Sequence, residues 1–486
     1  MHKLMLRIVA YLAFYTLKSR PHFFTITSHL LPNNRLCFTR HADKAWLERT
    51  ERKNKMKVKI IALLLVLLLL LCGVLVGCKT EPYVGADKTD TLRGRALQLG
   101  RALIDNYIYY DGGVPCVAEK VSTLFRHKLN VASVWHVTAV IAATNYLAEM
   151  GGVDGKYFAD VNAQLWDSLT YYAGTAEICT YGGKSTERMY AVNRAAAPEQ
   201  ADISGINAVY DDQMWLVREL IASYRNTGKA DYLTQAEELT QTCLDGWDCT
   251  LRADGTEYGG ITWGAGYASK HTCSNAPMIA PLVDLYDIYA ETNAEKAAYY
   301  LDFAVKIYDF CRNTFVNDYG VYGDLVGTEF VTRADGTKQT TSQGTLDPTA
   351  YTYNTGTVLQ GAAKLYAATN DEQYLSYARK LAELSYKYFM LNETLDYDKR
   401  NSNTWFDFQL LLGYVELIKV VDGEHKDAVQ GYVDHFESTL TNAYNNFYSN
   451  GLLPDDLGGG WGFESQKNVL DSAACVEMLA VLYLNL

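Results

Sequence analysis

The chain has 486 residues, with 44 Lys and Arg, 56 Asp and Glu, and a formal net charge of −12. Without the 13 basic and 3 acidic residues of 1–77, the remainder holds 31 basic and 53 acidic residues, a net charge of −22. An acidic surface repels phosphate backbones, which argues against a nucleic acid partner. The seven cysteines after Cys78 are scattered, with no CxxC or Cys/His cluster. The sequence therefore predicts no metal site.

The first predicted element is an export signal over residues 56–78. Lys57 and Lys59 precede a leucine-rich run, and no further charge occurs before Lys79. A charged start followed by an apolar stretch is typical of a secretory signal.

The signal ends in the letters LVGC, which resemble the lipobox of bacterial lipoproteins, where the cysteine is acylated. A transmembrane helix is the alternative, because 60–78 is long enough to span a bilayer. We expect an exported protein, lipid-anchored through Cys78 at the bacterial cell envelope or surface. In that interpretation 1–55 is an over-extended N-terminus and 79–89 a short tether.

From residue 90 onward the apolar residues recur with helical spacing. The pattern predicts twelve helices, and alternating strands are hardly visible. The predicted helices are 90–109, 131–149, 158–172, 205–225, 230–244, 271–290, 294–313, 355–369, 371–389, 403–421, 427–447 and 471–484.

The connections between these helices alternate in length. Short polar turns follow the even-numbered helices, and the pieces SYRNTGKADYL, IYAETNAEKAAYY and LYAATNDEQYL around three of them resemble one another. Long connections rich in glycine and aromatic residues follow the odd-numbered helices. Such repeats predict six helical hairpins. The simplest closed arrangement is a single-domain, all-α (α/α)6 barrel over 90–486, with the even helices inside and the long loops at one end.

Asp211 and Asp212 are the strongest catalytic candidates, because they are adjacent acids near the start of an inner helix. Like charges at close range raise one pKa while the other carboxylate stays ionised. That division suits glycoside cleavage, which needs a proton donor and a nucleophile, and a separation of about 5–5.5 Å implies retention. The alternative is that the pair only caps the helix and opposes its macrodipole.

Other polar and aromatic residues stand in the long loops or at the starts of inner helices. We expect them to converge with the acid pair on one site, as a substrate requires. Two further features receive plainer interpretations. We expect His136 to be a core histidine, and Asp455-Asp456, which stands beside glycines, to form a turn or at most part of the cleft rim. The expected substrate contacts are Tyr210, Trp135, Trp263, Asn275, Tyr353, Asn354, Trp405 and Asp407.

Five motifs in order resemble glycoside hydrolase family 76, the endo-α-1,6-mannanases of mannan backbones. They are YDDQMW, GGITW with KHTCSN, TYNTGTVLQGAAKLY, NTWFDFQLLLGYVEL and DSAACVEMLA. The resemblance implies an (α/α)6 barrel, a retaining mechanism with Asp211 as nucleophile and Asp212 as general acid/base, and no metal or organic cofactor. It also implies a mannan-type substrate, and we expect a monomer. Departures are YNTG in place of YNQG, the SNAP segment, and a Thr- and Gly-rich insertion at 326–350.

Two alternatives remain. One is another (α/α)6 enzyme, either a sugar epimerase or an unsaturated glucuronyl hydrolase, for which Lys270 and Arg400 are the available uronate-binding cations. The other is a surface lipoprotein that binds glycans without cleaving them.

Overall fold

The computed structural model describes residues 89–391, 394–395 and 403–485. The predicted export signal, the lipobox cysteine Cys78 and Arg400 lie outside the described residues. The architecture described below is that of the unit that begins at Tyr83.

The twelve predicted helices are all present in the described part of the chain, with their ends shifted by a few residues. The largest shift is at the sixth, where 271–290 was predicted. There the chain first forms β6 and a short 3-10 helix before the α-helix begins. The helices are α3 (Leu92–Tyr107), α4 (Val134–Glu149), α5 (Gly152–Leu169), α6 (Tyr210–Thr227), α7 (Ala230–Asp245), α8 (Ile279–Tyr289), α9 (Ala294–Thr314), α10 (Thr352–Thr369), α11 (Glu372–Phe389), α12 (Thr404–Ile418), α13 (Gly423–Phe447) and α14 (Val469–Asn485).

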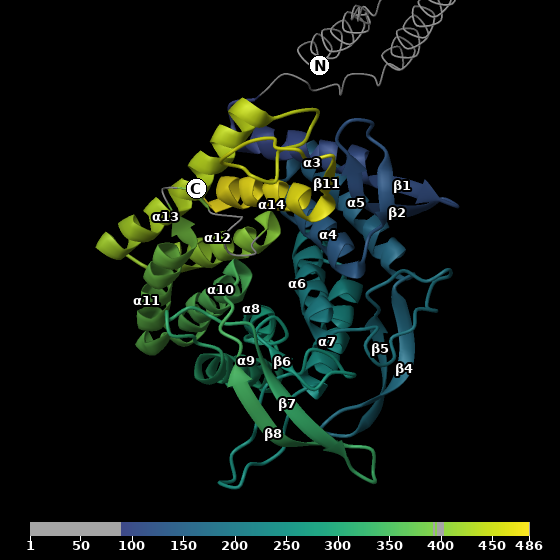
Figure 1. Ribbon diagram of the computed structural model, residues 1–486, viewed down its shortest axis with the longest axis vertical. Coiled ribbons are helices and arrows are strands. Elements are labelled where there is room, and N and C mark those ends of the chain that lie inside the picture. Colours follow the sequence, from purple (N-terminus) through teal and green to yellow (C-terminus); the bar gives the residue numbers. More distant parts are fainter. Residues whose placement is uncertain (1–88, 392–393, 396–402, 486) are drawn as a thin grey trace, which may run out of the picture. The chain divides into compact units, whose positions relative to one another are not determined.

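The even-numbered helices close into an inner ring. Each contacts the next in the order α4, α6, α8, α10, α12 and α14, and α14 returns to contact α4. The odd-numbered helices pack outside them, for example α7 against α6 and α9 against α8. Figure 1 shows this double layer of helices, and it confirms the predicted (α/α)6 barrel.

Sequence explains why the even helices are inside. In α4 the run 137–145 is buried on every side, as expected for a helix surrounded by others. Two glycines allow α10 and α12 to approach closely: a Cβ built on Gly356 would lie 2.3 Å from the carbonyl oxygen of Gln409, and one on Gly413 would lie 2.8 Å from that of Gly356. The short turn after α6 uses Gly228 in the left-handed conformation, φ 69°, which closes the helix.

The prediction that strands are nearly absent was wrong. Short antiparallel strands occupy the long connections, where the helical periodicity lapses and β-branched residues are frequent. They form four small sheets: β1-β2-β11 with β3 on β2, β4-β5, β6-β7-β8 and β9-β10. The strands are β1 (Ile108–Asp111), β2 (Val114–Ser122), β3 (Lys128–Val131), β4 (Ala173–Cys179), β5 (Lys184–Tyr190), β6 (Lys270–His271), β7 (Leu325–Thr332), β8 (Lys338–Leu346), β9 (Met390–Leu391), β10 (Thr394–Leu395) and β11 (Gln466–Asn468).

The predicted insertion at 326–350 forms the β7-β8 hairpin, which projects from the helices in Figure 1. Strand β7 also pairs with β6, where Lys270 faces Val326 and His271 faces Leu325. The hairpin therefore extends a strand that belongs to the connection between α7 and α8.

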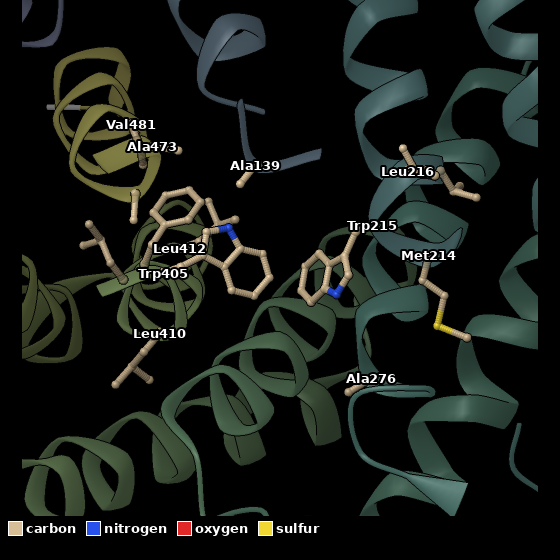
Figure 2. Packing of buried hydrophobic residues seen from close by; sticks show 14 of the residues in the cluster. Ala139, Met214, Trp215, Leu216, Ala276, Trp405, Leu410, Leu412, Ala473 and Val481 are labelled. Atoms are coloured by element: carbon tan, nitrogen blue, oxygen red, sulfur yellow. The ribbon is translucent and has the colours of Figure 1, made fainter. Parts of the chain in front are cut away.

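Aromatic side chains fill the interior of the ring. Figure 2 shows the rings of Trp215 on α6 and Trp405 on α12 pointing toward each other, and their centroids are 4.9 Å apart in an edge-to-face contact. The seven cysteines of the described chain are free thiols, five of them buried. Among the described residues, no helix combines the length and apolar character that crossing a membrane requires.

Candidate active site

The two candidate acids lie in the first turn of α6, which starts at Tyr210 after the long connection from α5 that contains β4 and β5. The start of α6 is joined to the connection between α7 and α8, because the Tyr210 amide donates to the Trp263 carbonyl at 2.8 Å. Both segments belong to the end of the barrel where the long connections gather.

Asp211 is half-buried and accepts two defined hydrogen bonds. The Trp263 indole Nε1 donates to its Oδ2 at 3.1 Å, and the Asp212 amide donates to its Oδ1 at 3.0 Å. The helix N-terminus adds a favourable field for negative charge. These three contributions stabilise the ionised form of Asp211, although burial still raises its pKa to about 6.

Asp212 has a different environment. It is buried, and no donor or cation among the described residues reaches its carboxyl group. Burial, followed by the negative charge of Asp211, raises the pKa of Asp212 well above its ordinary value. Burial and the charge of Asp211 thus favour the protonated form of Asp212, whereas the two hydrogen bonds favour the ionised form of Asp211.

Two rings pack against the Trp263 indole. The imidazole of His271 stacks on it with centroids 4.7 Å apart, and Tyr267 lies 4.6 Å away. Burial lowers the pKa of His271 to about 4, so this ring is neutral. The indole is thus held at a fixed angle toward Asp211.

Asn275 holds the same loop. Its Oδ1 accepts from the Ile261 amide at 2.7 Å, and its Nδ2 donates to the carbonyls of Ile261 and His271 at 2.9 and 2.8 Å. The side chain is fully buried and its amide is engaged on both ends. It supports the loop that carries Trp263, and the geometry does not leave it free to contact a substrate as expected from sequence.

A set of rings lies beside the acid pair. Trp135 packs edge-to-face on Trp405 at 5.3 Å and is stacked near Phe406 at 6.0 Å, while Tyr353 lies 4.2 Å from Phe406. Trp135, Tyr353 and Phe406 are partly exposed, whereas Trp405 is buried. The buried indole N–H groups of Trp135 and Trp405 have no acceptor among the described residues. They are donors still available at this end of the barrel.

Three other predicted contacts are more deeply placed. Tyr210 is buried between α6 and α7, where its ring covers Gly246, so it belongs to the core and not to a substrate surface. Asn354 is fully buried and donates to the Gly323 carbonyl at 3.3 Å. Asp407, in the first turn of α12, is also buried. The place of a residue near the start of an inner helix did not reveal whether its side chain faces the candidate site or a neighbouring helix.

The structure also brings in residues that the sequence interpretation missed. Burial, then the charges of Asp211 and Asp324, raises the pKa of the Cys273 thiol well above its ordinary value. These effects favour the protonated thiol, and both Asp211 and Asp324 are close enough to Cys273 to influence it. Asp324 precedes β7 in a connection that has no recognisable motif, so only the pairing of β6 with β7 reveals its position.

Two other sequence interpretations can be compared with the structure. The Asp456 Oδ1 accepts from the amides of Gly458 and Gly459 at 3.0 and 2.6 Å, which confirms a turn at Asp456, whereas Asp455 pairs with the buried Lys467. His136 is half-buried and lies 2.7 Å from the Ser133 hydroxyl. Burial lowers the pKa of His136 to about 4, which agrees with a packed neutral histidine.

Lys270 does not fit the role of a uronate-binding cation. Its side chain is fully buried, and its Nζ lies 2.7 Å from Oδ2 of the equally buried Asp248. Among the described residues, no group of three His, Cys, Asp or Glu side chains is arranged as metal ligands.

The closed double ring of helices, with paired acids and rings at its long-loop end, defines a protein of the (α/α)6-barrel class. The model of glycosyl hydrolase family 76 matches residues 132–430, which is more than half of the chain. The chain belongs to this family, as the five motifs suggested.

Two curated relatives are fungal mannan endo-1,6-alpha-mannosidases. The one from Saccharomyces cerevisiae is 28% identical over 166 residues, which is 33% of this chain and 33% of the relative. The one from Candida albicans is 26% identical over 185 residues, 37% of this chain and 38% of the relative. The chain thus spans between about a third and two fifths of the length of these relatives.

Solved structures share the fold. A family 76 mannosidase from Bacteroides thetaiotaomicron superposes with a TM-score of 0.60 at 23% identity, covering 80% of this chain and 97% of that one. An inactive α-1,6-mannanase variant from Salegentibacter sp., with two consecutive aspartates replaced by asparagine, was solved with α-1,6-mannotriose. Its TM-score is 0.62 at 17% identity, covering 81% of this chain and 100% of that one.

Proposed function

We propose that the protein is a retaining glycoside hydrolase that cleaves α-1,6-mannosidic bonds within mannan-type polysaccharides. The observation that carries this proposal is the unequal bonding of the acid pair. Asp211 accepts from Trp263 and from a backbone amide, whereas Asp212 has no donor among the described residues. An ionised nucleophile beside a protonated acid is the starting state that a retaining glycosidase needs.

In the first step, Asp212 gives its proton to the glycosidic oxygen while the Asp211 carboxylate attacks the anomeric carbon. The bond between that carbon and the oxygen breaks, and the leaving sugar departs with a hydroxyl group. A covalent glycosyl ester on Asp211 results. In the second step, the Asp212 carboxylate takes a proton from water, the water oxygen attacks the anomeric carbon, and Asp211 is released as carboxylate.

The rings beside the pair suit a sugar chain. Sugar C–H faces stack on aromatic rings while the hydroxyl groups keep their hydrogen bonds. We propose that Trp135, Tyr353 and Phe406, which are partly exposed, supply such faces, and that Trp263 both binds and orients. The unpaired indole N–H of Trp135 would then donate to a substrate hydroxyl.

The choice of mannan rests on the family and on its members. The curated relatives are named as mannan endo-1,6-alpha-mannosidases. The Salegentibacter variant with α-1,6-mannotriose was made inactive at two consecutive aspartates, the same pattern as Asp211-Asp212 here. By contrast, the burial of Lys270 removes a cation that a uronate-specific alternative would use.

The test is to incubate the purified chain with debranched α-1,6-mannan and follow products by chromatography and proton NMR. We expect a ladder of oligosaccharides whose new reducing ends first form as the α-anomer. Asp211→Asn and Asp212→Asn are the controls. Failure of folded wild-type protein to release any reducing end would refute the hydrolase proposal.

The same three proteins, tested for mannan binding as well, distinguish the hydrolase from a protein that binds glycans without cleaving them. If wild type and both Asn variants retain mannan equally and none of them releases oligosaccharides, the protein is a glycan-binding module. Cleavage that is lost in both variants excludes that alternative.

We also propose that the protein acts as a monomer at the cell surface, lipid-anchored through Cys78. Support comes from the charged start, the apolar run and the LVGC sequence. Expression in a bacterium with labelled palmitate should label wild type and not Cys78→Ser, and the variant should appear in the soluble fraction. Equal labelling of both proteins would contradict this anchor.

A further inference from the structure

A pocket of about 420 Å³ lies between α9, the connection after α7, and the β7-β8 hairpin. Its volume falls within the range of roughly 300–1,000 Å³ that is usual for small-molecule sites. None of the residues proposed above to act on the scissile bond lines it. The lining residues are Trp247, Arg252, Glu257, Tyr258, Gly259, Lys306, Phe310, Asn313, Thr314, Val326, Gln343, Gly344 and Leu346.

Aromatic rings and paired charges share this pocket. Phe310 packs edge-to-face on Trp247 at 5.9 Å, and Tyr258 is partly exposed. Glu257 accepts from the Trp247 indole at 2.7 Å and from Lys306 at 2.8 Å. These partners neutralise the carboxylate. Arg252, whose guanidinium lies 4.7 Å from the Tyr258 ring and donates to the backbone carbonyls of Glu257 and Tyr258, leaves the wall with one excess positive charge.

Gln343 adds an unused acceptor. Its Oε1 atom is buried and has no donor among the described residues. A buried carbonyl oxygen without a donor is costly, and a turn of the partly exposed Gln343 side chain would present it to a ligand hydroxyl. Gln343 lies on β8, so the hairpin that departs from the family motifs contributes this group.

The pocket is also connected to the acid pair. The ammonium group of buried Lys270 lies 5.7 Å from the Tyr258 ring and 5.8 Å from the Phe310 ring. The next residue, His271, stacks on Trp263, which in turn donates to Asp211. The pocket and the acid pair are therefore built on opposite sides of one short strand.

We propose that this pocket is an accessory glycan site that binds a mannose unit of the same polymer, away from the bond being cleaved. Rings combined with a neutralised carboxylate and a free acceptor fit a neutral polyhydroxylated ligand, which buries its C–H faces and exchanges hydroxyl hydrogen bonds. This inference rests on the proposed function, since the polymer that occupies the pocket is the proposed substrate.

The experiment compares two substrates in the full chain: debranched α-1,6-mannan and a short aryl α-mannobioside. Tyr258→Ala and Gln343→Leu each remove one contact. For both variants we expect KM on mannan to rise about 3- to 10-fold, which corresponds to the loss of one stacking or hydrogen-bond contact. We expect kcat on mannan, and both constants on the short substrate, to remain within about 2-fold of wild type by the same reasoning. Tyr483→Ala is the matched control, because Tyr483 is a half-exposed tyrosine near the end of α14.

Binding is measured separately by retardation in native gels that contain mannan, using the Asp211→Asn background. The proposal predicts weaker retardation when Tyr258→Ala or Gln343→Leu is added, and no change with Tyr483→Ala. Unchanged KM and unchanged retardation in both pocket variants would overturn the accessory-site proposal. An equal loss of kcat/KM on the two substrates would also overturn it, because such a loss would place the effect at the acid pair. If wild type cleaves mannan, the hydrolase proposal stands whatever the pocket variants do. If folded wild type does not cleave mannan, the hydrolase proposal itself is refuted.

Discussion

The indole Nε1 of Trp263 donates to the Oδ2 of Asp211 at 3.1 Å and joins residues 52 positions apart in the sequence. This bond gives the two adjacent acids different surroundings. Asp211 gains a fixed donor, while Asp212 faces the charge of Asp211 in a buried position. The difference between the two acids thus comes from a loop that belongs to the next hairpin.

Trp263→Phe should keep the ring stack and remove the donor. A hydrogen bond to a charged group contributes about 1.5–3 kcal/mol, so kcat/KM should fall about 10-fold or more. The pKa of Asp211 should rise further, which moves the acidic limb of the pH profile to higher pH. An unchanged acidic limb in this variant would show that the indole does not stabilise the ionised nucleophile.

The activity of wild type should depend on pH in a bell shape. Activity needs ionised Asp211, so kcat/KM should fall as pH drops through about 6, the raised pKa of that carboxyl. Activity also needs protonated Asp212, whose pKa is raised further by burial and by Asp211, so it should fall again on the alkaline side. The two apparent values describe the coupled pair. A profile that stays flat from pH 4 to pH 6 would contradict the assignment.

Asp212→Asn should abolish most activity and stabilise the fold at neutral pH. Removing a general acid costs about 10²- to 10⁴-fold in rate. The folded pKa of Asp212 lies above the unfolded value, so its favourable contribution is complete below about pH 4 and is lost as pH rises through the folded pKa. The gain in free energy of unfolding over wild type should therefore be larger at pH 7 than at pH 4.

Urea unfolding at both pH values measures this difference. The control is Asp456→Asn, which changes an exposed aspartate in a loop turn. An equal gain for the Asp212 variant at both pH values would mean that folding does not raise the pKa of the Asp212 carboxyl group.

Lys270→Met should destabilise the protein strongly, because it leaves Asp248 buried without its cation. Removing one partner of a buried ion pair costs about 3–5 kcal/mol. Adding Asp248→Asn should recover part of that loss. Lys387→Met is the matched control, since Lys387 pairs with Glu383 on the exposed surface of α11, where solvent screens the pair and its loss should have little effect on stability.

Thermal or urea unfolding distinguishes the two lysines. If Lys270→Met and Lys387→Met cost the same, the Asp248–Lys270 pair does not hold the connection between α7 and α8. Reduced kcat/KM should accompany the loss of stability at Lys270, because His271 and Trp263 belong to the same connection.

The sequence by itself determined the helices, the hairpin repeat and the candidate acids. Helical periodicity is a local property, and the alternation of short and long connections sets which helix ends meet. The barrel and the location of Asp211 and Asp212 in the first turn of an inner helix could therefore be predicted. The family motifs also predicted both the barrel and the position of the two acids.

Only the tertiary structure decided which side chains face the site. Helix position placed Tyr210 beside the acids, but rotation of α6 turns its ring toward Gly246. The strands of the long connections escaped prediction, because their pairing depends on contacts such as those between β6 and β7 that are distant in sequence. The unequal environments of Asp211 and Asp212 follow from one such contact, the indole of Trp263, since burial and hydrogen bonding act through space and not along the chain.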